Sequence, residues 1–415
     1  MIIGTFSMKR SIGRVLTKIA PRAGLLALGI AFSFILAVAC SSSDPAAQPQ
    51  ATSQQQQEQQ GLTGATPTSV RTAAKDAGKF QVTGTVSERR QYFSTALLHD
   101  GRILIAGGRQ VGFGATPDGA GLKSAEVYDP KTKQARSIAD MSDLRLLFLA
   151  ETLADGKVLV AGGVNQSKFP SNTAELWNPA TEKWIPTGPM HYPRDTLAWV
   201  TLQDGRVLAI GGNDDRFSFL ATAETYDPAT ETWTEVAPMA TARAWHTATL
   251  LEDGRVLVAG GGRTDGPYIN SAEVYDPVKN EWTPAGTMSL GRAFHTATLL
   301  KNGRVLVVGG KGKRTKAEVW DPAANTWSPA GETAEPRSEH VAALLPDGRV
   351  LVAGGTGIRS TAEMYDPATN SWSPASEMRY GRYRHGAVVL TDGSVLIIGG
   401  IGKDGVVAET ELYVP

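Results

Sequence analysis

From residue 80 onward, short apolar runs alternate with polar turn residues along the chain. In one such unit, the run at residues 247–251 is followed by an Asp-Gly pair and then by a second apolar run at residues 256–259. Two such runs joined by Asp-Gly predict an antiparallel hairpin with a tight turn. A third strand is predicted at residues 272–275, where an Asp-Pro turn follows, and a fourth strand contains Trp282. The unit therefore predicts four short antiparallel strands.

This four-strand unit occurs seven times, and each second strand ends in a pair of glycines. The pairs are spaced 45 to 55 residues apart, and their second glycines are Gly108, Gly163, Gly212, Gly261, Gly310, Gly355 and Gly400. A four-stranded sheet repeated about an axis is the blade of a β-propeller. The period, the double glycine, the aromatic residue of the third strand and the Trp of the fourth resemble the kelch repeat. The resemblance implies an all-β, seven-bladed kelch-type β-propeller.

The two ends of the repeated region predict how the ring closes. The seventh unit stops after its third strand, at residues 411–415, so its fourth strand is missing. Residues 80–87 align without a gap to residues 282–289, with Phe80 at the position of Trp282. We therefore expect residues 80–86 to supply the missing strand and remove the free sheet edges. In the first unit Ala135 stands at the Trp position, which predicts the least well packed blade.

The N-terminal residues predict export and lipidation. Five basic residues precede an uncharged apolar run at residues 23–39, and this run ends in Ala-Val-Ala before Cys40. That arrangement resembles the bacterial lipobox, which implies a diacylated Cys40 as the mature N-terminus. Cys40 is the only Cys of the chain, so an internal disulfide is excluded. The alternative is an uncleaved membrane anchor, because the apolar run is at the lower limit for spanning a bilayer.

The next segment, residues 41–78, is rich in Ser and Gln and has too few apolar side chains to fold. We therefore expect three parts: a lipoprotein signal peptide at residues 1–40, a disordered tether at 41–78 and the propeller at 79–415. The expected location is the bacterial cell envelope, with a lipid anchor in the outer or cytoplasmic membrane and the propeller outside the cytoplasm. Ser41 favours the outer membrane where a host has two.

Charge narrows the possible partners. Lys and Arg together equal Asp and Glu at 41 each, so the formal net charge is zero, and no basic stripe with interleaved aromatics is present in the repeats. A nucleic-acid partner is therefore not expected. We expect a monomer whose contacts are the membrane, through its lipid, and one unknown protein or glycan.

One Arg and one Glu recur in every unit, the Arg before the first strand and the Glu in the third. A buried charge is tolerable only when it is paired and hydrogen-bonded, so equal numbers of each sign predict seven structural Arg–Glu pairs. The expected members are Arg90, Arg145, Arg194, Arg243, Arg292, Arg337, Arg382, Glu126, Glu175, Glu224, Glu273, Glu318, Glu363 and Glu411.

Four histidines also share one position, three residues after the Arg. They are His246, His295, His340 and His385. Equivalent residues of adjacent blades are separated by about 10 Å, the spacing of packed sheets, whereas the ligands of one zinc ion lie about 2 Å from it. Phe or Leu occupies the position in the other units. We therefore expect these side chains to pack between blades, and we expect no metal or other cofactor.

The connections between strands predict a binding face. The turns from first to second strand are nearly always Asp-Gly, whereas the loops from second to third strand vary in length and composition. Unequal loops of repeat proteins commonly form the binding face, and aromatic residues with Arg are typical of interfaces. The alternative is that the aromatics cap the blades and the charges are merely solvated. The candidate face consists of Arg109, Phe113, Phe169, Tyr192, Asp214, Asp215, Arg216, Phe217, Arg263, Tyr268, Lys313, Arg314, Arg359 and Tyr380.

Two functions remain open. We expect a non-enzymatic recognition scaffold that binds a protein or glycan through this face, with no catalytic residues; the alternative is a carbohydrate-active enzyme that resembles the sialic-acid type of sugar mutarotase. A broad apolar surface would favour the first, and converging Arg, Glu and Tyr at the channel mouth would favour the second. A copper enzyme like galactose oxidase is not expected, because its cofactor needs a Cys beside the site and an added copper-binding domain. Here the only Cys is Cys40, and the sequence ends at Pro415.

Overall fold

The computed structural model describes residues 78–110, 121–263, 266–312 and 314–415. The chain divides into two units, Met1–Val70 and Arg71–Pro415, and all described residues belong to the second. The predicted signal peptide and Cys40, and nearly all of the predicted tether, lie outside the described residues. Within these residues no helix is both long and apolar enough to cross a membrane.

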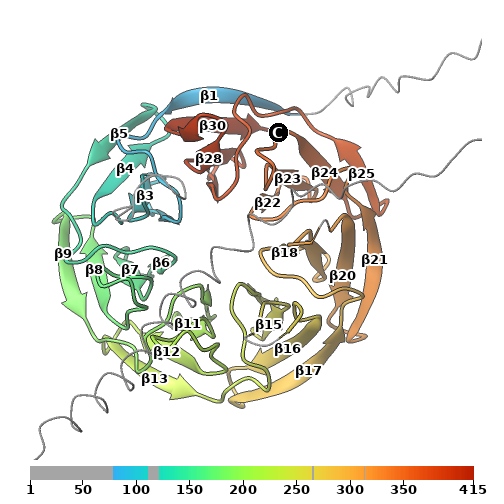
Figure 1. Cartoon of the computed structure of the whole chain (residues 1–415), viewed down its shortest axis with the longest axis horizontal. Coiled ribbons are helices and arrows are strands. Elements are labelled where there is room, and N and C mark those ends of the chain that lie inside the picture. The colour runs from blue at the N-terminus through green and yellow to red at the C-terminus, as the bar shows by residue number, and fades with distance from the viewer. Residues whose placement is uncertain (1–77, 111–120, 264–265, 313) are drawn as a thin grey trace, which may run out of the picture. The chain divides into compact units, whose positions relative to one another are not determined.

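The described residues form the predicted seven-bladed β-propeller, and Figure 1 shows the fourth strands along its outer rim. We name the four strands of a blade a to d in chain order. Blade 1 consists of β2 (Ser94–Leu97), β3 (Ile103–Ala106), β4 (Ala125–Asp129) and β5 (Gln134–Ser137). Blade 2 consists of β6 (Leu149–Thr152), β7 (Val158–Ala161), β8 (Ala174–Asn178) and β9 (Lys183–Thr187). Blade 3 consists of β10 (Ala198–Thr201), β11 (Val207–Ile210), β12 (Ala223–Asp227) and β13 (Thr232–Val236).

The remaining blades follow the same antiparallel order. Blade 4 consists of β14 (Thr247–Leu250), β15 (Val256–Ala259), β16 (Ser271–Asp276) and β17 (Glu281–Thr287). Blade 5 consists of β18 (Thr296–Leu299), β19 (Val305–Val308), β20 (Lys316–Asp321) and β21 (Thr326–Glu332). Blade 6 consists of β22 (Val341–Leu344), β23 (Val350–Ala353), β24 (Ala362–Asp366) and β25 (Ser371–Pro374). Blade 7 contains β26 (Gly386–Val389), β27 (Val395–Ile398) and β30 (Glu409–Val414), with a hairpin of β28 (Ile401–Gly402) and β29 (Gly405–Val406) in its b–c loop.

Blade 7 is completed by the N-terminal strand, as the sequence predicts. β1 (Lys79–Thr85) pairs antiparallel with β30, so that Phe80 lies opposite Tyr413 and their ring centroids are 5.0 Å apart. Figure 1 shows the blue β1 beside the red β30. The outer strand of the last blade therefore comes from the start of the propeller, and closure joins the two ends of the fold.

The glycine pairs provide a second link between blades. The N–H of the second glycine donates to the carbonyl of the Arg that begins the next blade, and this contact repeats through Gly400 and Arg90 at 2.9 Å, which joins blade 7 to blade 1. The first glycine cannot be replaced without strain: at Gly260, φ is +66° and a Cβ would lie 2.5 Å from the Arg292 carbonyl oxygen. Both glycines therefore let the backbones of adjacent blades approach closely.

The core lies between adjacent blades. All b strands are fully buried, and the apolar clusters combine residues of neighbouring sheets. Strand c contributes an aromatic ring that packs against the Trp of strand d, as in Tyr275 and Trp282 at 4.9 Å. In blade 1, where Ala135 replaces the Trp, Tyr128 instead shares hydrogen bonds with the hydroxyls of Thr83 and Thr410. The reduced stability expected of blade 1 stays a prediction.

Candidate functional site

Each of the seven recurrent Arg residues forms an ion pair with the Glu of its own repeat. The Arg side chains are at most 2% exposed, and the N–O distances lie between 2.5 and 3.0 Å. The pairs are Arg90–Glu126, Arg145–Glu175, Arg194–Glu224, Arg243–Glu273, Arg292–Glu318, Arg337–Glu363 and Arg382–Glu411. These are the seven pairs that the sequence analysis expects. We call each pair with its backbone partners a clamp.

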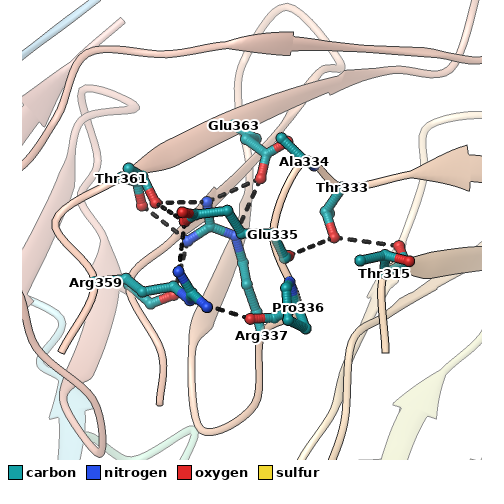
Figure 2. Close-up of polar contacts among 10 residues, drawn as sticks. Thr315, Thr333, Ala334, Glu335, Pro336, Arg337, Arg359, Thr361 and Glu363 are labelled. Atoms are coloured by element: carbon teal, nitrogen blue, oxygen red, sulfur yellow. Dashed lines mark hydrogen bonds and ion pairs between the residues drawn. The ribbon is translucent and has the colours of Figure 1, made fainter. Parts of the chain in front are cut away.

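Figure 2 shows the clamp of blade 6. Arg337 Nη1 donates to the carbonyl oxygens of Gly354 and Thr361, while Nη2 donates to Glu363 Oε1. The other carboxylate oxygen of Glu363 accepts the backbone N–H of Ala334 at 2.8 Å. One clamp thus ties the end of strand b, the start of strand c and the connection from the preceding blade. Because both charges are paired and hydrogen-bonded, their role is structural.

The four histidines pack between blades, as expected. At Gly260 of blade 4, a Cβ would lie 2.7 Å from His295 Cε1 of blade 5, so the ring fills the space that the glycine leaves. Burial lowers the pKa of His295 and of His340 to about 3, which keeps both rings neutral. Among the described residues, no three His, Cys, Asp or Glu side chains gather as a metal site would require.

The b–c loops and the d–a connections lie on one face of the propeller. The residue after each clamp Arg lies beside the residue after the glycine pair, as the β-bridges Asp195–Asn213, Ala244–Gly262 and Tyr383–Ile401 show. The a–b connections lie at the opposite ends of the same strands. There the turns repeat one pattern, in which the Asp or Asn side chain accepts the backbone N–H of the residue two positions later, as Asp253 does from Arg255.

Seven residues encircle the axis of the propeller at the start of the a strands. Each stands two positions after a clamp Arg, has φ between 50° and 57° and is partly buried. Six backbone hydrogen bonds of 3.0 to 3.2 Å join each residue to the preceding one around the circle. We call this set the mouth ring; it consists of Tyr92, Leu147, Thr196, Trp245, Phe294, Glu339 and Arg384. Positive φ at non-glycine residues is strained and tends to occur at functional sites.

One arc of the mouth ring is polar. Arg384 Nε donates to Glu339 Oε1 at 3.2 Å, and the two side chains are only 14% and 6% exposed. The Arg384 guanidinium lies 4.4 Å from the centroid of the Tyr92 ring. The Arg109 guanidinium lies 5.4 Å from the same centroid. Burial raises the pKa of Tyr92 above its ordinary value. Arg, Glu and Tyr side chains from blades 6, 7 and 1 therefore converge here.

The adjoining arc is aromatic. Trp245 and Phe294 stack with centroids 5.2 Å apart and planes inclined by 23°, and Phe219 meets the Trp245 ring edge-on at 5.3 Å. Lys311 Nζ lies 5.3 Å from the Phe294 centroid. Blades 3 to 5 thus contribute a continuous apolar wall beside the polar arc, and a cation stands at its edge.

Asp195 is a buried carboxylate next to the mouth ring. Its Oδ1 accepts hydrogen bonds from Thr196 Oγ1 at 3.0 Å and from Asn213 Nδ2 at 3.1 Å. Burial raises its pKa to about 6, and these two hydrogen bonds only partly offset that effect. Asp195 therefore titrates in a range where an ordinary surface Asp is fully ionised.

The candidate residues predicted from the loops divide among several places. Arg109 contributes to the polar arc. Phe169 and Asp215 line an open cleft of about 530 Å³ between the loops of blades 2 and 3. The ring centroids of Phe217 and Phe169 are 6.1 Å apart. Burial raises the pKa of Tyr268, which Arg314 and Glu339 also influence in opposite directions.

Other candidates stabilise their own surroundings. Asp214 accepts two backbone N–H groups within its loop, and Arg359 forms an ion pair with Glu335 at 2.8 Å, visible in Figure 2. Tyr192 donates to Glu235, and Tyr380 packs beneath the guanidinium groups of two arginines. Arg216 and Arg263 are exposed, whereas Phe113 and Lys313 lie outside the described residues.

The sequence analysis missed the mouth ring, apart from its neighbour Arg109. It considered the Arg and the His of the Arg-x-x-His pattern but not the two residues between them. Those residues differ from blade to blade within a nearly constant frame, as in Arg243-Ala-Trp-His246 and Arg337-Ser-Glu-His340. Variation inside a fixed frame was the available signal, although the positive φ and the circular arrangement required the structure.

Family models match most of the propeller. The model described as the KLHDC2/KLHL20/DRC7 Kelch-repeats domain matches residues 237–400. The Kelch motif model matches residues 92–142, 152–191 and 200–240. No curated protein matches the chain.

Among solved structures, the chain is similar to a fungal alcohol oxidase of the AA5 family, described as having catalytic diversity and solved in complex with copper. The TM-score is 0.65 at 21% sequence identity, over 82% of this chain and 77% of that one. Identity at this level shows a common fold alone. In the described part of this chain, the four blade-packing histidines each lie in a separate contact between blades, and no set of three His, Cys, Asp or Glu side chains converges.

Proposed function

We propose that this kelch-repeat β-propeller is a recognition module of the bacterial cell envelope, and that it binds a protein or glycan through the face formed by its b–c loops and d–a connections. In this proposal a lipid on Cys40 anchors the chain, and residues 41–78 hold the propeller away from the membrane. The lipobox-like sequence before Cys40 and the Ser- and Gln-rich composition of residues 41–78 support the anchor and the tether.

The mouth ring is the observation on which the binding role depends. All seven clamps use the same two residue types, whereas the position two residues after each clamp Arg holds a different side chain in every blade. A structural requirement shared by all blades would select one residue type, as it does for the clamp. Variation at a strained and partly exposed ring instead supports recognition of something external.

A second function is supported by the polar arc. Glu339, Arg384 and Tyr92 converge at the channel mouth, which is the arrangement expected of a sugar mutarotase-like enzyme. A carboxylate could move a proton while a guanidinium orients an anionic substrate. The aromatic arc beside them favours binding, so the mouth combines both features and the experiments must separate the two functions.

Binding is tested with the full-length protein, used in detergent when it fractionates with membranes. A glycan array and a pull-down from envelope extract are compared for the wild type and for a variant with Trp245→Ala and Arg384→Ala. We expect the wild type to retain a glycan or a protein that the double variant loses. Equal retention by both proteins would contradict use of the mouth, and no specific retention by the wild type would contradict the proposal.

The anchor and the enzyme are tested separately. Cys40→Ala is expected to abolish incorporation of labelled fatty acid and to release the protein from membranes; unchanged labelling would contradict lipidation. Exchange between sugar anomers is followed by NMR with wild type and Glu339→Gln. Acceleration by the wild type that the variant lacks would establish the enzymatic function in place of the non-enzymatic one.

A further inference from the structure

We infer that the mouth ring binds one terminal saccharide residue, held between the aromatic arc and the Glu339 carboxylate. The inference rests on the proposed function and specifies which of its two partner classes the ring takes. It follows from three properties of the ring: a buried acceptor, an adjacent aromatic wall and the balance of charge around both.

The buried acceptor is Glu339 Oε2. The side chain is 6% exposed, and Oε1 accepts the hydrogen bond from Arg384 Nε. Oε2 is buried and has no hydrogen-bond partner among the described residues. A buried carboxylate oxygen without a hydrogen bond raises the free energy of the folded protein, and a donor group of a bound ligand would remove this penalty. A hydroxyl group is such a donor.

The aromatic wall is next to this acceptor along the ring. The N–H of Phe294 donates to the carbonyl of Trp245, and the N–H of Glu339 donates to that of Phe294 at 3.0 Å. Three consecutive positions of the ring are therefore occupied by two stacked aromatic residues and then by Glu339. Aromatic surface with a few fixed polar groups is the usual lining of a small-ligand site. A saccharide ring fits it, since the C–H face can cover an aromatic ring while the hydroxyls donate sideways.

The charge balance excludes a cationic ligand. Arg384 neutralises Glu339, Arg109 lies over Tyr92 at the far end of the polar arc, and Lys311 lies over Phe294 where the two arcs meet. The mouth therefore has more positive than negative charge, which repels an ammonium group and tolerates a neutral or acidic one. The expected ligand is a sugar without a free amine, neutral or bearing a carboxylate.

The test uses an array of glycans that end in neutral, acidic or free-amine sugars, followed by competition with the free monosaccharides. The array measures recognition of a glycan end, and the competition shows whether the sugar alone suffices. Full-length wild type is compared with Glu339→Gln, which keeps the shape and presents a donor in place of Oε2, and with Trp245→Leu, which removes the central ring of the aromatic wall. Glu281→Gln is the control, because this carboxylate is exposed on the outer strand β17.

We expect neutral or acidic sugars to bind and amine-bearing ones to fail. Glu339→Gln should weaken binding by about 10- to 100-fold, the loss expected for a hydrogen bond to a charged group. Trp245→Leu should weaken it by about 10-fold, and Glu281→Gln should leave it unchanged. If Glu339→Gln melts at a much lower temperature than the wild type, Trp245→Leu alone decides.

Other outcomes overturn the inference in distinguishable ways. Glycan binding that survives both ring substitutions would place the sugar elsewhere on the face, and the proposed function would stand. Retention of a protein but no glycan would overturn the inference and again leave the proposed function. Binding of amine-bearing sugars in preference to the others would contradict the charge argument. No specific binding of any partner would overturn both proposals.

Discussion

The clamp and the mouth ring are two residues apart in every repeat, yet they follow opposite rules. The clamp Arg is the same in all seven blades and is buried against fixed backbone carbonyls and one Glu. The ring residue is different in every blade and is only partly buried. The repeat thus holds one constant structural position and one variable position within a single four-residue segment, which is Arg-x-x-His in blades 4 to 7.

The clamp also explains how the ring can vary. The clamp fixes the Arg two positions before each ring residue. The residue that follows the ring residue is a His or an apolar residue, and its side chain packs against the glycine pair of the preceding blade. Backbone fixed on both sides can keep a positive φ whatever side chain stands between. The ring residues are therefore free to differ without loss of the fold.

Breaking a clamp should have the largest effect. Arg243→Ala leaves the Glu273 carboxylate buried without its partner, which is expected to cost about 3 to 5 kcal/mol of unfolding free energy in urea titrations. The double variant Arg243→Met with Glu273→Leu removes both charges and should be less destabilised than Arg243→Ala. A double variant as unstable as the sum of its single variants would show that the pair itself contributes little.

Asp195, which lies between the clamp residue Arg194 and the ring residue Thr196, should make the unfolding free energy depend on pH. Asp195 has a folded pKa of about 6, above its ordinary 3.8, so the folded state holds its proton more tightly. Stability is then lost as pH rises from 4 to 6 and stays low above 6. Asp195→Asn keeps the two accepted hydrogen bonds, and its unfolding free energy should rise by about 2 kcal/mol relative to that of the wild type between pH 4 and 7. A constant difference across that range, measured by urea unfolding, would contradict the assigned shift.

His295, which follows the ring residue Phe294, should make the unfolding free energy depend on pH in the opposite direction. His295 has a folded pKa of about 3, below its ordinary 6.5, so its contribution is complete above pH 6.5 and declines as pH falls towards 3. His295→Phe copies the residue that blades 1 and 2 use there. Between pH 7 and 5 the wild type should lose about 2 kcal/mol more than the variant. The control Phe93→Leu should not alter the pH dependence.

The sequence was sufficient for features that repeat. Gly-Gly and the matched Arg and Glu recur in all seven units and Asp-Gly in six of them, so each has one physical explanation that is tested in many places. The alignment of residue 80 with Trp282 predicted the closing strand. The mouth ring could not be predicted in this way, because its members share no side chain. What they share is a backbone conformation and a position on the circle, as Leu147 and Glu339 illustrate. The contact between Phe169 and Phe217 could not be predicted either, because the two residues lie in loops of adjacent blades that are far apart in sequence.

The smallest effect is expected at a ring position outside both arcs. In Leu147→Gly the relief of a left-handed backbone, about 1 to 2 kcal/mol, offsets the greater chain entropy of glycine and the loss of a partly buried side chain. Unfolding free energy should therefore change by less than about 1 kcal/mol. Leu149→Gly, two residues further on at the buried start of β6, should cost more than about 3 kcal/mol. Equal losses at the two sites would mean that the ring is as much a part of the structural core as the clamp, and the distinction between the two positions would fail.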